Sequence, residues 1–578
     1  MAQTTVARSD GGGGGEPQHG LVGRTLWYRA TDRYPETGPR LFYLGIVVVA
    51  TIILYYQLYV AGAVAPQILA HYGMSFRFYV YITVVGNAVG AFTSLLAGLG
   101  DRWGRANMTV YGLLITGLLV LFGIPNAPNE WAFAVIVVAV GFVEGIILVA
   151  TPALVRDFSP QLGRASAMGF WTLGPVVGSL VVSEVASHTL SHLHAWQDQF
   201  VICGIVGLVV FAFALFGLRE LSPGLRDQLM VSMRDRALIE ARAKGIDIEA
   251  SLRRPWRQML HLDIVLSAFA IAVFLLIYYT MVGFNVIYFE SIFGFSASQA
   301  NALGNWIWAF DAGGLIVIGF LSDRARVRKP FMVVGSLGAA AMTIYYLLQA
   351  THPHTGYYTF VWIVSLLAVF LAIGFAPWMA SYTETVERRN PALTATGLAV
   401  WGWVLRAVVA ISIFILPFVV NSMTPIVDNG AKLTALEKHY AAEIATAGAV
   451  DPATLHTLTV NPSNTTAGLK AATEVSAKFH VPLPNAISRL ETLAAAAKQP
   501  DFKFLQSEGP KVEHALAVSP GQWQNWYWVC VAGELAFLPL VLVMAGRWRP
   551  SQAKADAEAH EQMVNEELAK LAAAGPGS

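Results

Sequence analysis

Charge is the scarcest property of this chain. Only 13% of its 578 residues are charged, against roughly 25% in soluble proteins, and 55% are hydrophobic. The mean hydropathy is +0.53. One or two soluble domains cannot bury so much apolar surface, which excludes a large soluble enzyme. The net charge of +1, without a large basic block, argues against a nucleic-acid partner.

The motifs of metal, redox and nucleotide chemistry are also missing. The two cysteines, Cys203 and Cys530, lie in apolar runs, and the 13 histidines show no zinc-ligand spacing. No GxxxxGK[ST] motif occurs, so ATP hydrolysis by a P-loop is excluded. The N-terminus is polar and glycine-rich and lacks the apolar core of a cleaved signal peptide. We therefore expect no cofactor, no metal and no enzymatic activity.

Long apolar runs dominate the chain instead. A helix needs about 20 mostly apolar residues to cross a bilayer. Such segments must be helices rather than open sheets, because the lipid offers no partner to a backbone amide. Twelve candidate spans meet this length: 41–68, 77–99, 107–125, 131–154, 164–187, 199–218, 263–289, 299–321, 330–349, 357–381, 392–420 and 524–546.

Basic residues fall in alternate connections between these spans. Arginines precede span 1, fill the linker 219–262, and follow spans 2, 4, 8, 10 and 12, whereas the short opposite loops carry almost none. Loops on the cytoplasmic side are enriched in Lys and Arg. We therefore predict a multi-pass protein of the plasma (inner) membrane with both termini in the cytoplasm.

The spans and polar stretches divide the chain into seven predicted parts. Residues 421–523 stand out as a polar, alanine-rich insertion outside the membrane, extracellular or periplasmic, with short amphipathic helices in "LTALEKHYAAEIATA" and "NAISRLETLAAAAK". The other parts are a cytoplasmic N-terminal tail (1–40), a six-helix bundle (41–218), a cytoplasmic linker (219–262), spans 7–11 (263–420), span 12 (524–546) and a cytoplasmic tail (547–578).

The chain contains an internal repeat. The charged hinge "AGLGDRWGRAN" at 97–107 follows span 2, and a relative, "GFLSDRARVRK" at 319–329, follows span 8. Glycines repeat with nearly the same spacing: Gly145, Gly169 and Gly174 correspond to Gly374, Gly397 and Gly402, and one of the two gaps differs by one residue. Two matches six spans apart predict a duplicated six-helix unit.

Twelve spans, the 6+6 repeat, the central linker and the loop from Leu99 to Arg105 resemble the major facilitator superfamily. The resemblance implies an all-α integral membrane fold of twelve transmembrane helices in two pseudo-symmetric six-helix bundles, with a midplane site between them. It also implies that Asp101 stabilises one conformation of a cytoplasmic gate, with Arg156 as a partner. The implied gating residues are Asp101, Arg102, Gly104, Arg105, Arg156, Asp323 and Arg324.

Four ionisable residues fall inside predicted spans: Glu144, Asp311, Arg406 and Glu534. Such groups are costly in a bilayer and mark functional sites by default. In one interpretation Arg406 binds an anionic substrate, and Asp311 or Glu144 carries a proton. In the other, Arg406 and Asp311 form a fixed structural pair. Glu534 is the weaker candidate, because span 12 is a supporting helix in the family that the chain resembles.

Aromatic and amide residues on spans 1, 7 and 10 complete the predicted substrate site. Besides Arg406 they are Tyr56, Gln57, Tyr279, Asn285 and Trp378. We expect a monomeric secondary transporter in the lipid bilayer that uses protons to move a small-molecule substrate, with an organic anion favoured. "GAVAPQILAHYGMS" and "IYFESIFGFSASQAN" are similar to metabolite:proton symporters.

Two alternatives remain open. "GFWTLGPVVGS" in span 5 resembles the Gly-Pro motif of proton-coupled exporters, which favours a drug or lipid antiporter. A transporter-like receptor or assembly partner would use the 421–523 loop for docking.

Overall fold

The protein is built almost entirely of helices. The computed structural model describes residues 26–93, 103–159, 173–222, 255–389 and 394–551, with a few single positions beside these ranges. Within them, the strands are two short ones, β1 (Ala30–Thr31) and β2 (Glu220–Leu221), which pair in parallel. Nine helices of the described part are long and apolar enough to cross a membrane. The predicted all-α membrane fold is confirmed.

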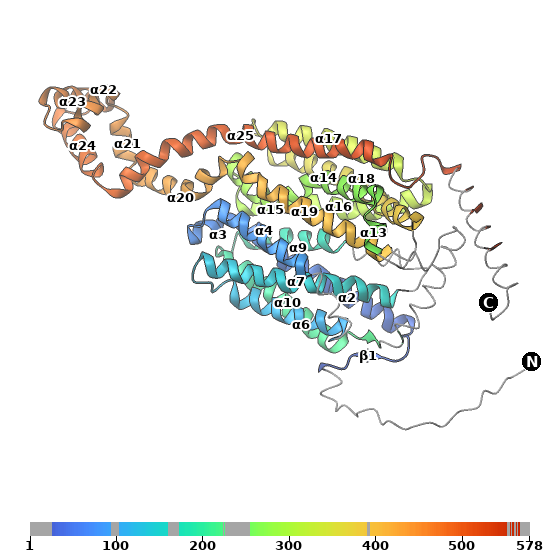
Figure 1. The fold of residues 1–578 in the computed structure, drawn as a ribbon. Coiled ribbons are helices and arrows are strands. Elements are labelled where there is room, and N and C mark those ends of the chain that lie inside the picture. The colour runs from blue at the N-terminus through green and yellow to red at the C-terminus, as the bar shows by residue number, and fades with distance from the viewer. Residues whose placement is uncertain are drawn as a thin grey trace, which may run out of the picture.

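The N-terminal half forms one helical bundle, blue to cyan in Figure 1. Helix α2 packs against α7, α9 and α10, while α4 and α6 pack on α7. A π-helical turn, Leu119–Gly123, extends α6. The helices of this bundle are α2 (Thr37–Ala63), α3 (Ala65–Tyr72), α4 (Phe76–Thr93), α6 (Arg105–Leu118), α7 (Glu130–Phe158), α9 (Gly174–Thr189) and α10 (Trp196–Gly217).

The C-terminal half forms a second bundle beside the first (Figure 1). Helix α18 packs on α16 and α17, and α14 packs on α19 and α25. The two bundles meet mainly where α9 contacts α16 and where α4 contacts α19. The helices are α13 (Pro255–Met259), α14 (Leu262–Phe274), α15 (Leu276–Phe293), α16 (Ala297–Ala325), α17 (Lys329–Gln349), α18 (Tyr357–Arg389), α19 (Thr394–Val419) and α25 (Pro500–Val541).

Each of the twelve predicted spans coincides with a helix or a pair of helices. Spans 1 and 7 are each interrupted, at Val64 and Leu275, where the backbone leaves the helical region. Residues 94–99 and 164–172 of the predicted spans 2 and 5 lie outside the described residues. The apolar pattern thus locates the spans, while breaks inside them depend on local backbone geometry.

The insertion between spans 11 and 12 is a folded helical unit, here called the cap. It consists of α20 (Met423–His439), α21 (Ala441–Ala447), α22 (Pro452–Val460), α23 (Thr465–Phe479), α24 (Leu483–Ala496) and the first part of α25. Figure 1 shows it projecting from one end of the bundles, with α20 and α25 as its base. Two apolar clusters of its own, one around Leu433 and Phe502 and one around Ala471 and Val475, hold it together. The predicted amphipathic helices are therefore confirmed.

Span 12 begins earlier than its apolar run. Hydropathy places its start at 524, but α25 is one continuous helix of 42 residues from Pro500. Its polar first part remains helical because Phe502, Leu505 and Val512 pack into the cap. An apolar run marks where a helix can enter lipid and does not mark where the helix begins.

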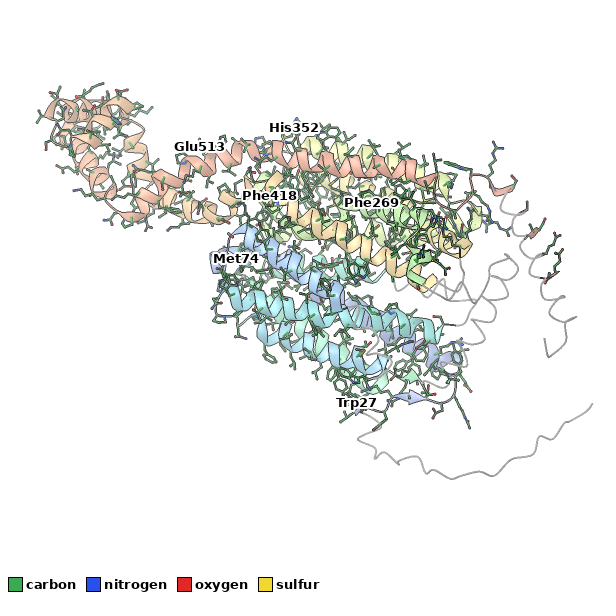
Figure 2. The ribbon with its side chains drawn as sticks, in the orientation of Figure 1. Trp27, Met74, Phe269, His352, Phe418 and Glu513 are labelled. Atoms are coloured by element: carbon green, nitrogen blue, oxygen red, sulfur yellow. The ribbon has the colours of Figure 1, made fainter. Side chains whose placement is uncertain are left out.

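The two ends of the bundles differ in charge. One end carries Arg105, Arg328 and Arg547 and is called the basic end; the other, from which the cap projects, is called the cap end. In Figure 2, Trp27 lies at the basic end, and Met74 and Phe418 lie at the cap end. This separation matches the predicted clustering of basic residues on one side of the membrane.

Two of the repeated glycines, Gly145 and Gly374, sit at close helix crossings with different partners. A Cβ on Gly145 of α7 would collide with the side chain of Thr93 and the backbone of Gly90, both on α4. A Cβ on Gly374 of α18 would lie 2.6 Å from Cζ of Phe274 on α14. Both positions need glycine because helices approach closely there. The sequence echo is real, but each copy packs against a different neighbour.

Candidate functional site

Charged and phenolic side chains from both bundles gather around the middle of the molecule. Tyr55 of α2 interacts electrostatically with Arg406 of α19 and with Glu144 of α7. Tyr279 of α15 interacts with Arg406 as well. The rings of Tyr55 and Tyr59 are 5.6 Å apart. This group, called the central cluster, brings together three predicted site residues: Arg406, Glu144 and Tyr279.

Glu144 is the acidic residue of the central cluster, and its carboxylate is buried without a hydrogen bond to the described residues. It lies at the middle of α7, its residue is 2% exposed, and neither carboxylate oxygen has a hydrogen-bond partner among the described residues. A buried ionised carboxylate without a partner is very costly, so such a group is normally neutral unless a ligand or ion pairs with it. Glu144 is therefore suited to gain and lose a proton or to bind a cationic group.

Asp311 lies on the C-terminal side of the same region. It is 5% exposed on α16 and interacts electrostatically with Tyr278 of α15. The ring of Tyr278 also contacts Trp308, at 5.1 Å between centroids, one turn before Asp311. Asp311 therefore interacts with Tyr278, whereas Arg406 interacts with Tyr55 and Tyr279.

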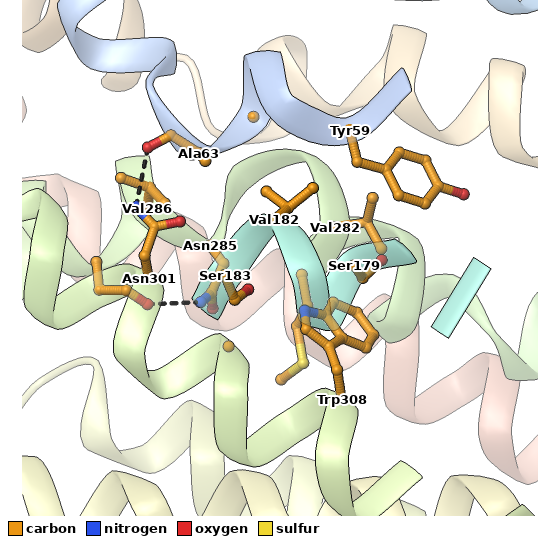
Figure 3. Close-up of a pocket in the computed structure, with 14 residues that line it drawn as sticks. Tyr59, Ala63, Ser179, Val182, Ser183, Val282, Asn285, Val286, Asn301 and Trp308 are labelled. Carbon is orange, nitrogen blue, oxygen red and sulfur yellow. Dashed lines mark hydrogen bonds between the residues drawn. The ribbon is translucent and has the colours of Figure 1, made fainter. Parts of the chain in front are cut away.

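A cavity at the interface of the bundles adjoins this cluster (Figure 3). Tyr59 from α2, Ser179 and Ser183 from α9, and Asn285 and Trp308 from α15 and α16 line it. The cavity offers about 30 Å³ to water, enough for one or two molecules. Asn285, a predicted site residue, reaches this space. Tyr59 links the cavity to the central cluster through its contact with Tyr55.

Two glycines of the span 5 motif shape the wall behind Tyr55. A Cβ on Gly178 of α9 would lie 2.5 Å from Cβ of Tyr55, and one on Gly174 would lie 2.7 Å from Cγ2 of Thr51. The exporter-like motif therefore lets α9 approach α2 closely. Its structural effect is to position Tyr55 in the central cluster.

Three predicted site residues face other parts of the fold. Tyr56 is 1% exposed and interacts with Cys203 of α10, and the amide of Gln57 lies against Gly207 of α10. Trp378 is buried between α18 and α14, where its Nε1 donates to the backbone oxygen and Oγ of Ser267, both at 3.2 Å. The sequence placed these residues on the correct spans, but only helix packing decides which face each one occupies.

Glu534, the weaker acidic candidate, also lies away from the cavity. It is fully buried between α25 and α17, where its Oε1 accepts a hydrogen bond of 2.8 Å from Oγ1 of Thr343. Its other carboxylate oxygen has no partner among the described residues. Span 12 therefore carries a buried acid inside the C-terminal bundle.

The loop after span 2 is tied to the end of span 4. Asp101 and Arg102 lie outside the described residues, as does the side chain of Arg156. Arg105 forms an ion pair with Asp157 of α7, at 2.8 Å between Nη1 and Oδ2. Gly104 has a φ of +90°, and a Cβ there would collide with Glu220. This position needs glycine both for its backbone conformation and for space.

Three residues missed by the sequence analysis complete this network at the basic end: Asp157, Glu220 and Arg29. Glu220 of β2 accepts hydrogen bonds from the backbone N–H of Arg105 and Ala106, at 2.8 and 3.4 Å. This places a carboxylate at the N-terminus of α6, where the helix dipole favours it. No local signal could pair Glu220 with this loop, because 115 positions separate Glu220 from Arg105.

Arg29, just before β1, joins the start of the chain to this network. Its residue is 1% exposed, and it donates to Oδ1 of Asn107 at 3.0 Å and to backbone oxygens at the C-terminus of α10, including Leu218 at 3.4 Å. Burial lowers the pKa of this guanidinium, but arginine remains protonated in proteins. A cation at a helix C-terminus is favourable, so Arg29 fastens β1 to the end of span 6.

The second hinge has a related network with its own arginine. Arg328 forms an ion pair with Asp323, at 2.7 Å, and approaches Glu384 of α18 at 3.5 Å. Glu384 lies near the end of span 10, as Asp157 lies near the end of span 4. Arg326 adopts a left-handed conformation with a φ of +54°. Asp323 is thus brought into a gate-like network, while Arg324 is exposed.

The cap end also joins the two bundles. Asp428 of α20 accepts a hydrogen bond from the backbone N–H of Phe76, the first residue of α4, at 2.8 Å. Asn301 of α16 donates to the backbone oxygen of Ala63 at 2.9 Å. These contacts cross from the C-terminal half to the N-terminal half, so they must break if the bundles separate at this end.

We expect Asp428→Ala to favour separation at the cap end. The change leaves the N–H of Phe76 without its acceptor, and a net hydrogen bond contributes about 0.5–1.5 kcal/mol, so the open population should rise by about 2- to 10-fold. Spin labels on α4 and α20 would report this by pulsed distance measurements. Asp428→Asn, which keeps an acceptor oxygen, is the matched control. Identical distance distributions in Asp428→Ala and the parent would contradict the prediction.

The comparison with known families decides what this architecture is. The model of the Major Facilitator Superfamily matches residues 47–423. This chain belongs to the Major Facilitator Superfamily. The resemblance predicted from the loop after span 2 and the six-span repeat is confirmed. As a member of this superfamily with nine described helices long and apolar enough to cross a membrane, the protein is an integral membrane protein.

Sequence relatives of this superfamily member match only parts of it. The hexuronate transporter of Escherichia coli (strain K12) is 24% identical over 178 residues, covering 30% of this chain and 40% of that transporter. The multidrug resistance protein MdtL of Shewanella oneidensis is 30% identical over 170 residues, covering 28% and 41%. The chain thus spans less than half of the length of these two relatives.

Solved structures of the superfamily share the fold. A bacterial homologue of the human lysosomal transporter Spinster, in an inward-facing and unoccupied conformation, matches with a TM-score of 0.52 and 15% identity, covering 88% of this chain and 99% of that one. A D-xylose–proton symporter matches with a TM-score of 0.50 and 14% identity, covering 65% and 90%. At these identities the likeness concerns the fold alone.

Proposed function

We propose that this superfamily member is a proton-coupled symporter that moves a small organic anion across the plasma membrane by alternating access. The observation that carries the proposal is the central cluster, in which Arg406 and the isolated acid Glu144 act on the same residue, Tyr55. A permanent cation beside a proton-accepting acid can bind a carboxylate and a proton together.

Each charged residue has a separate role in this proposal. Arg406 binds the substrate carboxylate, because a guanidinium presents several donors and stays charged. Glu144 carries the coupled proton, since both of its oxygens are without partners among the described residues. Asp311 is a second proton carrier on the C-terminal side. Tyr279 and Asn285 contact the bound substrate.

The networks at the basic end act as the gate. The ion pair of Arg105 and Asp157, with Glu220 at the start of α6, links span 3 to span 4 and to the segment after span 6. Asp101 and Arg102 of that loop and Arg156 near the end of α7 belong to the same gate, and Asp323 with Arg328 forms the counterpart in the second bundle. The basic end faces the cytoplasm, with both termini, and the protein acts as a monomer.

The relatives favour an anion as the substrate, although they leave an alternative. One relative is a hexuronate transporter, and hexuronates are carboxylates. Others are named multidrug resistance protein and efflux pump. A proton-coupled exporter of drugs or lipids is therefore the second candidate, favoured by the glycines that place α9 against α2.

Proton flux in proteoliposomes tests the proposal. A pH-sensitive dye inside the vesicles would report protons carried with carboxylates, sugars or cationic drugs. We expect carboxylates alone to drive acidification. Arg406→Ala should weaken their apparent affinity by about 10- to 100-fold, since a hydrogen bond to a charged group contributes roughly 1.5–3 kcal/mol. Flux driven by cationic drugs, with carboxylates silent, would support the exporter instead.

A further inference from the structure

The cavity beside the central cluster is polar without being charged. Of its lining residues, Ser179, Ser183, Asn285 and Asn301 are hydroxyls and amides, and Tyr59 and Trp308 add aromatic faces. Among the described residues that line it, none is Asp, Glu, Lys, Arg or His. Figure 3 shows these side chains converging from α2, α9, α15 and α16. Residues of both bundles therefore line the cavity, which lies at the interface between them.

Two polar atoms in this lining have unused hydrogen-bonding capacity. Oγ of Ser179 and Oδ1 of Asn285 are buried and have no hydrogen-bond partner among the described residues. The amide nitrogen of Asn285 makes one long hydrogen bond, 3.5 Å, to the backbone oxygen of Ala300. Buried polar groups are normally paired, and leaving one unpaired costs stability. These atoms therefore call for a partner that can both donate and accept.

The other amide of the cavity is already occupied. Asn301 donates to the backbone oxygens of Ala63 and Ala297, at 2.9 and 2.8 Å. Asn301 is thus used to hold α16 against the first half, and the free capacity is concentrated at Ser179 and Asn285. These two residues come from opposite bundles, so a ligand held between them would contact both halves of the protein.

We propose that this cavity is a hydroxyl-binding subsite and that the solute is a polyhydroxylated carboxylate, such as a sugar acid. The inference rests on the proposed function, because Arg406 must hold the carboxylate. Tyr59 and Tyr55 connect the cavity to Arg406. Hydroxyl groups both donate and accept, as Ser179 and Asn285 require.

The size of the cavity agrees with a site that opens during the cycle. At about 30 Å³ it has room only for groups the size of one or two water molecules in this conformation. Its walls belong to α9 and α16, which lie on different bundles and separate when access alternates. Opening gives room to the solute hydroxyls, which then supply the hydrogen bonds that Ser179 and Asn285 lack.

Binding to the purified full-length protein tests the proposal, with calorimetry as the measurement. The probes are glucuronate and tetrahydropyran-2-carboxylate, which keeps the ring and the carboxylate but lacks the hydroxyls. We expect the parent to bind glucuronate at least about 10-fold more tightly, because a site built for hydroxyls discriminates strongly against an analogue without them. Ser179→Ala and Asn285→Ala should each weaken glucuronate binding by about 3- to 10-fold and leave the analogue unchanged.

Two controls separate this proposal from the proposed function. Ser365→Ala removes another buried, unpartnered hydroxyl that is not part of the cavity, and it should change neither affinity. Arg406→Ala should weaken both probes. Equal binding of both probes by the parent, with both weakened in Arg406→Ala, would overturn the hydroxyl subsite alone. If neither probe binds the parent, both proposals fail.

Discussion

Replacement of Glu144 by glutamine is expected to abolish uphill, proton-driven uptake while leaving exchange of substrate across the membrane intact. Glutamine has nearly the same shape but cannot carry a proton. Because the carboxylate of Glu144 has no hydrogen-bond partner among the described residues, the substitution removes no hydrogen bond to them. Accumulation against a gradient should fall to the level of vesicles without protein, whereas counterflow of labelled substrate should continue.

Glu534→Gln is the matched control for this experiment. Glu534 is also buried in a membrane helix, but it is bonded to Thr343 inside the C-terminal bundle and lies away from the cavity. We expect this variant to retain uphill uptake. If Glu144→Gln accumulates substrate as well as the parent while Glu534→Gln does not, the proton pathway runs through span 12 and the role assigned to Glu144 is wrong.

Gly145→Val should cause a large loss of stability in the N-terminal bundle. A Cβ at this position lies 2.8 Å from Cα of Gly90 and even nearer to two oxygen atoms of α4. Backbone atoms cannot rotate aside, so α4 and α7 must separate. Overpacking of this kind costs about 1–3 kcal/mol, and occasionally more. The expected result is a lower melting temperature and a lower yield of monodisperse protein.

Gly402→Val provides the comparison, because Gly402 also lies in a membrane helix and was singled out by the same repeat. A Cβ on Gly402 would have nothing within 4 Å. That variant should retain the stability of the parent, measured by fluorescence-detected size-exclusion after heating. Equal losses in both variants would mean that the effect comes from valine in a helix and not from the crossing of α4 and α7.

Features that depend on the composition of a single segment of the chain could be predicted from the sequence. Apolar length predicted twelve spans, and nine described helices are long and apolar enough to cross a membrane, because lipid requires about 20 apolar residues and a self-satisfied backbone. The alternation of basic loops placed Arg105, Arg328 and Arg547 at one end. The repeated hinge indicated two related halves. Each of these signals depends on local composition or on comparison of two stretches.

The site residues show where this local reasoning stops. Tyr55, Tyr56 and Gln57 are consecutive, and the sequence analysis chose the last two for the substrate site. In the structure, Tyr55 joins the central cluster, while Tyr56 and Gln57 pack against α10. Successive residues on a helix point about 100° apart, so the choice depends on which neighbour covers each face. A helix that is apolar all round carries no pattern to reveal this.

Contacts between residues far apart in the chain could not be predicted from the sequence for a related reason. By itself, the sequence determined an all-α membrane fold of two related halves, since bilayer thickness, backbone hydrogen bonding and charge placement act on each segment separately. Only the tertiary structure decided that Arg105 pairs with Asp157, that Glu220 lies at the start of α6, and that Glu144 stays unpartnered among the described residues. Those outcomes depend on which helices meet, and helix packing is settled by the contacts of the whole chain.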